Sequence, residues 1–145
     1  MKALIQRVTQ AKVVVDGTTV GEINQGILAF IGVEQSDATT NADKLLNKII
    51  NYRIFSDNDD KMNLSLQDIN GGLLLVSQFT LVANTQKGLR PSFSNAGSPD
   101  MSKQLYEYMI EQAKSTSLTV QTGVFAADME VSLINDGPVT FNLQC

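Results

Sequence analysis

The stretch Ile27-Leu28-Ala29-Phe30-Ile31-Gly32-Val33 decides the fold. It is a short, unbroken apolar run with several β-branched side chains, and the turn residues Asn24-Gln25-Gly26 precede it. Such a run is typical of a strand that is buried on both faces, and we expect it at the centre of a sheet. A second run, Leu73-Leu74-Leu75-Val76, follows the turn residues Asn70-Gly71-Gly72 and predicts another buried strand.

The segments on either side of these runs also predict strands. Residues 3–9, 12–15 and 18–23 precede the central run, and the turn signal Asp16-Gly17 predicts a hairpin between the last two. Near the C-terminus, residues 128–133 and 139–143 alternate between apolar and polar side chains, which is typical of half-buried strands. Asn135-Asp136-Gly137-Pro138 is expected to connect these two strands.

Two further segments predict helices. Ser36-Asp37 offers side-chain oxygens that can cap free backbone N–H groups before the first. Ser98-Pro99-Asp100 supplies a capping hydroxyl, a proline for the first helical position and an acid for the first turn of the second. The apolar faces follow at helical spacing, as Ala42, Leu45, Leu46, Ile49 and Ile50, and as Met101, Leu105, Tyr108, Met109 and Ala113.

Together these segments predict a single α+β domain over residues 1–145. We expect roughly seven or eight strands, mostly antiparallel, in a sheet or barrel with two helices.

The composition excludes several kinds of chemistry. The chain has 145 residues and no histidine, so a Ser-His-Asp or Cys-His triad and most zinc sites are excluded. Its one thiol, Cys145, rules out a disulfide framework and suits a reducing compartment. We predict a cytoplasmic protein, because the N-terminus has no signal-peptide pattern and no apolar run is long enough to span a membrane. A net charge of −4 argues against non-specific binding along a nucleic-acid backbone, and we expect no DNA partner.

Ser77-Gln78-Phe79-Thr80 is the first candidate for a site. Three hydrogen-bonding side chains surround one aromatic residue where a predicted buried strand ends, and strand ends often carry functional groups. The alternative is that Ser77 and Thr80 only satisfy backbone groups at the strand terminus. The spacing of these residues leaves both interpretations open.

Three other patterns have a functional and a simpler interpretation. Gly137-Pro138 permits a rigid cis peptide in a pocket wall, or an ordinary turn between strands. The stretch from Lys87 through Arg90 to Phe93 combines two cations with an aromatic ring that could hold a phosphate and a base, or forms a solvated loop. The acidic run from Asp57 to Asp60 superficially matches a calcium loop, but it lacks the glycine and the distal glutamate of an EF-hand, and a solvated turn is the simpler interpretation.

In combination, these blocks resemble the D-aminoacyl-tRNA deacylase family in its common bacterial and eukaryotic form. The resemblance extends over nearly the whole chain, and the blocks occur in one order. They are Ile5-Gln6-Arg7-Val8, Asn51-Tyr52-Arg53-Ile54-Phe55, Lys61-Met62-Asn63, Ser77-Gln78-Phe79-Thr80-Leu81, Lys87-Gly88-Leu89-Arg90-Pro91-Ser92-Phe93, Ala127-Asp128-Met129-Glu130-Val131-Ser132-Leu133 and Asn135-Asp136-Gly137-Pro138-Val139-Thr140.

The resemblance implies an enzyme that needs no metal or other cofactor. It would hydrolyse the ester between a D-amino acid, or achiral glycine, and the 3'-terminal ribose of tRNA. Ser77-Gln78-Phe79-Thr80 would line the ester site, with the Phe79 N–H stabilising the oxyanion. Since no histidine can activate Thr80, we expect it not to be the nucleophile, and we expect the 2'-hydroxyl of the ribose to help activate water.

The resemblance also implies a homodimer with active sites shared between subunits. A cis Gly137-Pro138 element would enter the partner's pocket and reject L-amino acids by steric clash. We further expect Lys87, Arg90 and Phe93 to hold the tRNA acceptor end.

The residues by themselves leave two rival functions open. A non-catalytic dimer could bind nucleotides or RNA ends through Phe79, Phe93, Lys87 and Arg90, and would show saturable affinity without product. A metal hydrolase could use the cluster at 57–60, and would lose its activity when a chelator is added.

Overall fold

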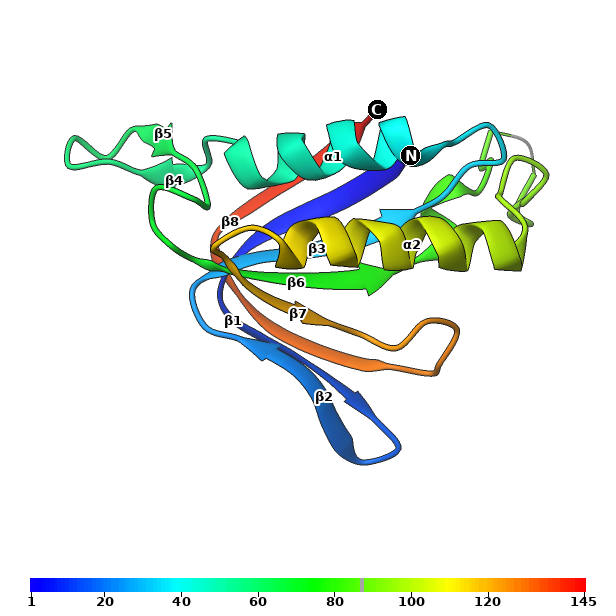
Figure 1. Cartoon of the computed structure of the whole chain (residues 1–145), viewed down its shortest axis with the longest axis horizontal. Helices are drawn as coiled ribbons and strands as arrows, with labels where there is room; N and C mark the ends of the chain where they lie inside the picture. The colour runs from blue at the N-terminus through cyan, green and yellow to red at the C-terminus, as the bar shows by residue number, and fades with distance from the viewer. Residues whose placement is uncertain (87) are drawn as a thin grey trace.

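A computed structural model describes residues 1–86 and 88–145. In these described residues, eight strands, two α-helices and a short 3-10 helix make one α+β domain (Figure 1). In chain order they are β1 (Lys2–Val15), β2 (Thr18–Ile23), β3 (Gly26–Gly32), α1 (Thr39–Asn51), β4 (Phe55–Ser56), β5 (Met62–Leu64), β6 (Gly72–Ser77), η1 (Phe79–Val82), α2 (Pro99–Lys114), β7 (Thr119–Thr122) and β8 (Glu130–Gln144).

The main sheet contains six strands in the order β2-β1-β3-β6-β7, with β8 also paired to β1. β1 pairs antiparallel with β2, β3 and β8, as expected for a mostly antiparallel sheet. β3 and β6 are parallel, and so are β6 and β7, which the strand patterns did not predict. The helices explain these pairs, because α1 lies between β3 and β6 in the chain and α2 lies between β6 and β7, as in crossover connections.

β3 and β6 form the centre of the sheet and are buried on both faces, which confirms the prediction for the two apolar runs. One face packs against α1 and α2, which lie side by side (Figure 1). The other face packs against residues of β1, β2 and β8. Alternate side chains serve the two cores: Ile27, Ala29, Ile31, Leu73 and Leu75 on the helix side, and Leu28, Leu74 and Val76 on the opposite side.

The predicted hairpin is present, but two predictions of separate short strands were wrong. Asp16 and Gly17 both have positive φ, at 49° and 76°, as a two-residue I′ turn between β1 and β2 requires. The expected strands at 3–9 and 12–15 are one strand, β1, whose register shifts near Val8 without a reversal of the chain. Likewise, the strands expected at 128–133 and 139–143 are one strand, β8.

Gly137 and Pro138 therefore lie within β8 and not in a turn between strands. Gln6 pairs with Thr140 and Val8 pairs with Asn135, so residues 136–139 of β8 stand opposite the single residue Arg7 of β1. Extra residues on one strand form a bulge, which bends the strand and leaves the extra residues outside the ladder. This bulge presents Gly137 and Pro138 as exposed residues.

Both helices bury the apolar faces predicted for them, except that a different tyrosine of α2 is the buried one. The α1 face is the expected one, whereas α2 buries Tyr106 and leaves Tyr108 half exposed. Ser98 caps α2 by accepting a hydrogen bond from the Met101 N–H at 3.3 Å, as predicted. Among the described residues, no helix has both the length and the apolar character that crossing a membrane requires.

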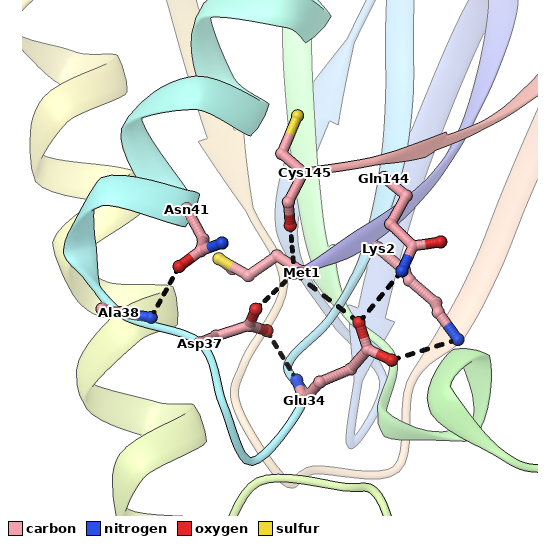
Figure 2. A network of polar contacts seen from close by, with 8 residues as sticks. All are labelled: Met1, Lys2, Glu34, Asp37, Ala38, Asn41, Gln144 and Cys145. Atoms are coloured by element: carbon pink, nitrogen blue, oxygen red, sulfur yellow. Dashed lines mark hydrogen bonds and ion pairs between the residues drawn. The ribbon is translucent and has the colours of Figure 1, made fainter.

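The cap predicted for α1 was wrong, because Asp37 binds elsewhere. α1 begins after Ala38, whose N–H is bound by the Asn41 side chain. The Asp37 carboxylate instead accepts hydrogen bonds from the Met1 α-amino group and from the Glu34 N–H, the latter at 2.7 Å (Figure 2). The same amino group donates to the Cys145 carbonyl at 2.6 Å, so one charged group joins β1, β8 and the approach to α1.

We expect Asp37→Asn to destabilise the fold, because the Met1 amino group is buried and Asp37 is its nearest carboxylate. Loss of one partner of a buried ion pair costs about 3 kcal/mol of unfolding free energy. The measurement is urea-induced unfolding followed by circular dichroism. Glu34→Gln is the matched control, since Glu34 is 3.7 Å from the amino group and partly exposed, and it should cost about 1 kcal/mol or less. Equal losses in the two variants would contradict the assignment.

Candidate active site

A cavity of about 540 Å³ opens where β6 ends. The end of β6 and the start of η1 form one wall through Ser77, Gln78 and Phe79. The segment from Phe125 to Val131 forms the opposite wall, and the first turns of α2 contribute Pro99, Ser102 and Tyr106. The cavity therefore brings together three segments that are far apart in the sequence.

Ser77, Gln78 and Phe79 lie where the sequence predicted a site, and they all line this cavity. The Gln78 N–H donates to the Ile31 carbonyl at 2.7 Å, which fixes the chain as it leaves β6 beside β3. The Phe79 ring is 62% exposed, so it is available to a ligand. These residues therefore form part of a cavity wall at the end of the strand.

Thr80 is exposed and is not among the residues that line the cavity. Its Oγ1 accepts a hydrogen bond from Gln78 Nε2 at 2.5 Å, which leaves its own O–H free to donate. No carboxylate or amine of the described residues is hydrogen-bonded to Thr80 Oγ1. The geometry therefore offers this hydroxyl as a hydrogen-bond donor, and provides no base that would activate it as a nucleophile.

The chain turns from β6 into the 3-10 helix at Phe79, and this turn frees backbone donors. The first hydrogen bond of η1 runs from the Leu81 N–H to the Gln78 carbonyl at 3.2 Å. The N–H groups of Phe79 and Thr80 have no acceptor among the described residues, as is usual for the first N–H groups of a helix. Such free donors can stabilise negative charge that develops on a bound oxygen.

Phe93 packs against Phe79, with ring centroids 5.0 Å apart and the planes inclined by 48°. The loop between them is closed by Asn84 and Ser92, whose backbones exchange hydrogen bonds of 2.7 and 3.1 Å. Arg90 is exposed within this closed loop. The predicted Phe93 and Arg90 thus belong to one loop beside Phe79, while Lys87 lies outside the described residues.

Gly137 and Pro138 do not line the cavity of their own chain. Their peptide bond is cis, and the bulge that contains them is held by Arg7. Arg7 Nε donates to the Asp136 carbonyl at 3.0 Å and lies 3.3 Å from Asp136 Oδ2, while Nη1 donates to the Ile54 carbonyl at 2.6 Å. A single protomer therefore does not bring the predicted selectivity element to the predicted ester site.

Sequence reasoning did not identify Arg7 and Tyr106 as candidates. Arg7 is a mostly buried cation in a strand, a pattern that by itself points to a specific partner. Tyr106 lines the cavity and its hydroxyl donates to the Leu75 carbonyl at 2.8 Å. Burial raises the pKa of this hydroxyl, so it remains a protonated donor at neutral pH. The sequence could have predicted that Tyr106 is buried, because its spacing from Met109 and Ala113 places it on the buried face of α2.

The acidic run at 57–60 forms a turn between β4 and β5. Asp57 accepts hydrogen bonds from the Asp59 and Lys61 N–H groups and from Asn63 Nδ2. The Asn63 and Lys61 donors hold the pKa of the Asp57 carboxyl below its usual range. Residues 1–86 and 88–145 contain no group of three side chains placed to hold a metal ion.

The chain is 64% identical over 143 residues to the D-aminoacyl-tRNA deacylase of Pseudoalteromonas translucida (strain TAC 125), and 60% identical over 144 residues to that of Proteus mirabilis (strain HI4320); each alignment covers 99% of both chains. A solved structure described as a c-Myc DNA Unwinding Element Binding Protein superimposes with a TM-score of 0.94 at 36% identity, and covers 100% of this chain and 99% of that one.

A second solved structure, of a probable eukaryotic D-amino acid tRNA deacylase, has a TM-score of 0.78 at 15% identity and covers 98% of each chain, so it shares the fold. Residues 4–144 match the D-Tyr-tRNA(Tyr) deacylase family. With this match over nearly all of its residues, the chain belongs to the D-Tyr-tRNA(Tyr) deacylase family.

Proposed function

We propose that this protein hydrolyses the ester between a D-amino acid and the 3'-terminal adenosine of tRNA, and releases the free amino acid and the free tRNA. Membership of the deacylase family supports the reaction class. The observation that carries the proposal is the cavity wall formed by Ser77, Gln78 and Phe79, with free backbone N–H groups where η1 begins. Such a wall can hold an ester carbonyl and stabilise its tetrahedral intermediate.

The reaction proceeds by attack of water on the ester carbonyl carbon. The carbonyl oxygen becomes an oxyanion that accepts hydrogen bonds from the Phe79 N–H and neighbouring donors. As the intermediate collapses, the bond from carbon to the ribose 3'-oxygen breaks and a proton reaches that oxygen. The adjacent 2'-hydroxyl of the ribose assists the attacking water, because it is held beside the ester and this chain has no histidine to act as base.

Selectivity for the D-enantiomer comes from the Gly137-Pro138 element of a second subunit. Gly137 and Pro138 are exposed and lie outside the cavity of their own chain, which is the arrangement a shared site in a homodimer needs. Backbone carbonyls beside the substrate's α-carbon leave room for hydrogen but not for the side chain of an L-amino acid. Glycine carries hydrogen on both sides of that carbon, so its ester is also a substrate.

Arg90 and Phe93 hold the acceptor end of the tRNA. Arg90 is exposed in the loop that Asn84 and Ser92 close, and it can pair with a phosphate. Phe93 and Phe79 form an exposed aromatic pair on which a base can stack. We assign Lys87 to the same role on the resemblance alone.

The first test compares D-Tyr and L-Tyr esters of the same tRNA, with a chelator present throughout. We expect many turnovers per protomer of the D-ester and at least about a hundredfold slower hydrolysis of the L-ester, because a steric clash of this kind costs several kcal/mol. Release of free tyrosine is measured by thin-layer chromatography. Equal rates would contradict exclusion of the L-side chain, and loss of activity with the chelator would favour a metal hydrolase.

The same experiment separates a catalyst from a binding protein. The solved relative described as a c-Myc DNA Unwinding Element Binding Protein makes nucleic-acid binding a second candidate function. A binding protein would retain the tRNA with saturable affinity and release no amino acid from either ester.

A second test ranks the substrate's 2'-hydroxyl against Thr80. We expect a D-aminoacyl ester on a terminal 2'-deoxyadenosine to react at least about a hundredfold more slowly than the ribose ester, in keeping with an assisting group held next to the ester. Thr80→Ala should slow the reaction by about tenfold or less, because Thr80 Oγ1 is bound to Gln78 and no base. The readout is the single-turnover rate. The opposite ranking would make Thr80 the nucleophile.

A third test concerns Arg7, which holds the bulge through the Asp136 and Ile54 carbonyls. We expect Arg7→Met to raise the ratio of L-ester to D-ester hydrolysis by about tenfold, because a looser bulge at 136–139 rejects the L-side chain less well. Arg53→Met is the matched control, since Arg53 is exposed and donates hydrogen bonds to Asn63 of β5 and not to the bulge. A selectivity change that is the same in both variants would contradict the role of the bulge.

A further inference from the structure

We infer that Tyr106 is a positioning residue for hydrolysis. Its hydroxyl stands where β6 and β7 separate, and it sets the wall formed by Ser77, Gln78 and Phe79 relative to the wall that begins at Phe125. The inference rests on the proposed ester site, and it adds a residue of α2 to that site. The geometry of the two parallel strands carries the argument.

The pairing of β6 with β7 ends just before the cavity. The register runs from Gly72 and Thr119 to Leu75 and Thr122. One more hydrogen bond follows, from the Gly123 N–H to the Leu75 carbonyl at 2.9 Å. β6 then continues to Ser77, while the segment after β7 leads from Gly123 toward Phe125. Residues of both segments line the cavity. The two walls of the cavity are therefore the two sides of a strand fork.

The Tyr106 hydroxyl occupies this fork. It donates to the same Leu75 carbonyl that Gly123 binds, at 2.8 Å. The backbone N–H groups of Ser77 and Gly123 lie near the phenol oxygen and act against the rise in its pKa that burial causes. One buried hydroxyl thus shares the Leu75 carbonyl with the Gly123 N–H at the point where the pairing of β6 with β7 ends, two residues before Ser77. Buried backbone groups of this kind need such partners.

The surroundings of the fork leave little room for other arrangements. A Cβ on Gly123 would lie 2.6 Å from Met129 Sδ, so the chain there passes close to the cavity wall. The Tyr106 ring is 2% exposed and packs near Phe125, with centroids 6.0 Å apart. Loss of the hydroxyl would therefore act on the fork itself.

The consequence for the reaction follows from the position of Ser77. It is the last residue of β6, and Gln78 and Phe79 come directly after it. If the Leu75 carbonyl loses one of its two donors, the end of β6 shifts or moves, and the donors beside the ester are displaced. Small displacements of reacting groups reduce the rate of the chemical step more than they reduce binding.

The test compares Tyr106→Phe with Tyr108→Phe. Each variant removes one hydroxyl from α2, but the Tyr108 hydroxyl donates to the exposed Asp43 at 2.9 Å and lies outside the cavity. With D-Tyr-tRNA as substrate, Tyr106→Phe should lower kcat by about tenfold and change KM by less than about threefold. Tyr108→Phe should leave both within about twofold of the original protein. Activity is measured well below the unfolding temperature of each variant.

Hydrogen exchange provides a readout that does not depend on activity. The amides of Ser77 and Gly123 should exchange at least about tenfold faster in Tyr106→Phe than in the original protein. In Tyr108→Phe their exchange rates should be unchanged. Replacement of Tyr106 by 4-aminophenylalanine keeps a donor toward the Leu75 carbonyl and should restore most of kcat. This replacement also serves as the second variant if Tyr106→Phe does not fold.

The outcomes separate this inference from the proposed function. Unchanged kcat in Tyr106→Phe, or an equal loss in Tyr108→Phe, would overturn the positioning role. A rise in KM with kcat unchanged would also overturn it, and would assign Tyr106 to binding alone. If the original protein released no amino acid from any D-ester, the proposed function would fail, whereas faster exchange of Ser77 would still locate the hydroxyl in the fork.

Discussion

β3 and β6 must bury both faces, because their side chains are apolar at almost every position. A strand of this kind is stable only when one layer covers each side. Two helices cover one side, and β1, β2 and β8 cover the other. The crossovers through α1 and α2 that provide the helical layer also make β6 parallel to both of its neighbours. The rest of the molecule is arranged around this pair of strands.

The site lies where this burial ends. β6 changes from buried apolar residues to Ser77 and Gln78 within one step of the chain, and the 3-10 helix begins immediately after. β7 has already left the ladder by this point, so a cavity opens between the strands. A rigid, fully packed strand thus supports a short polar segment, which suits an enzyme that acts through preorganised donors.

β1 and β8 provide the second part of the proposed site in a different way. The four residues of the bulge opposite Arg7 are held out of the ladder by contacts to one guanidinium group. This leaves Gly137 and Pro138 exposed on the surface of a long strand, away from the cavity of the same chain. On one protomer the cavity lacks the bulge residues, and the bulge lies outside the cavity. This agrees with the proposed site between two subunits, in which the second copy completes the pocket.

The sequence alone determined the two buried strands, the β1–β2 hairpin, both helices with most of their buried faces, and the position of Ser77-Gln78-Phe79. These are local features, since periodicity, turn residues and a change of polarity are all encoded within a few neighbouring residues. The tertiary structure decided the parallel pairings, the fusion of predicted strands into β1 and β8, the partner of Asp37, and the burial of Tyr106 in place of Tyr108. Each of these depends on which distant segment supplies the opposing atoms, and no local pattern contains that information.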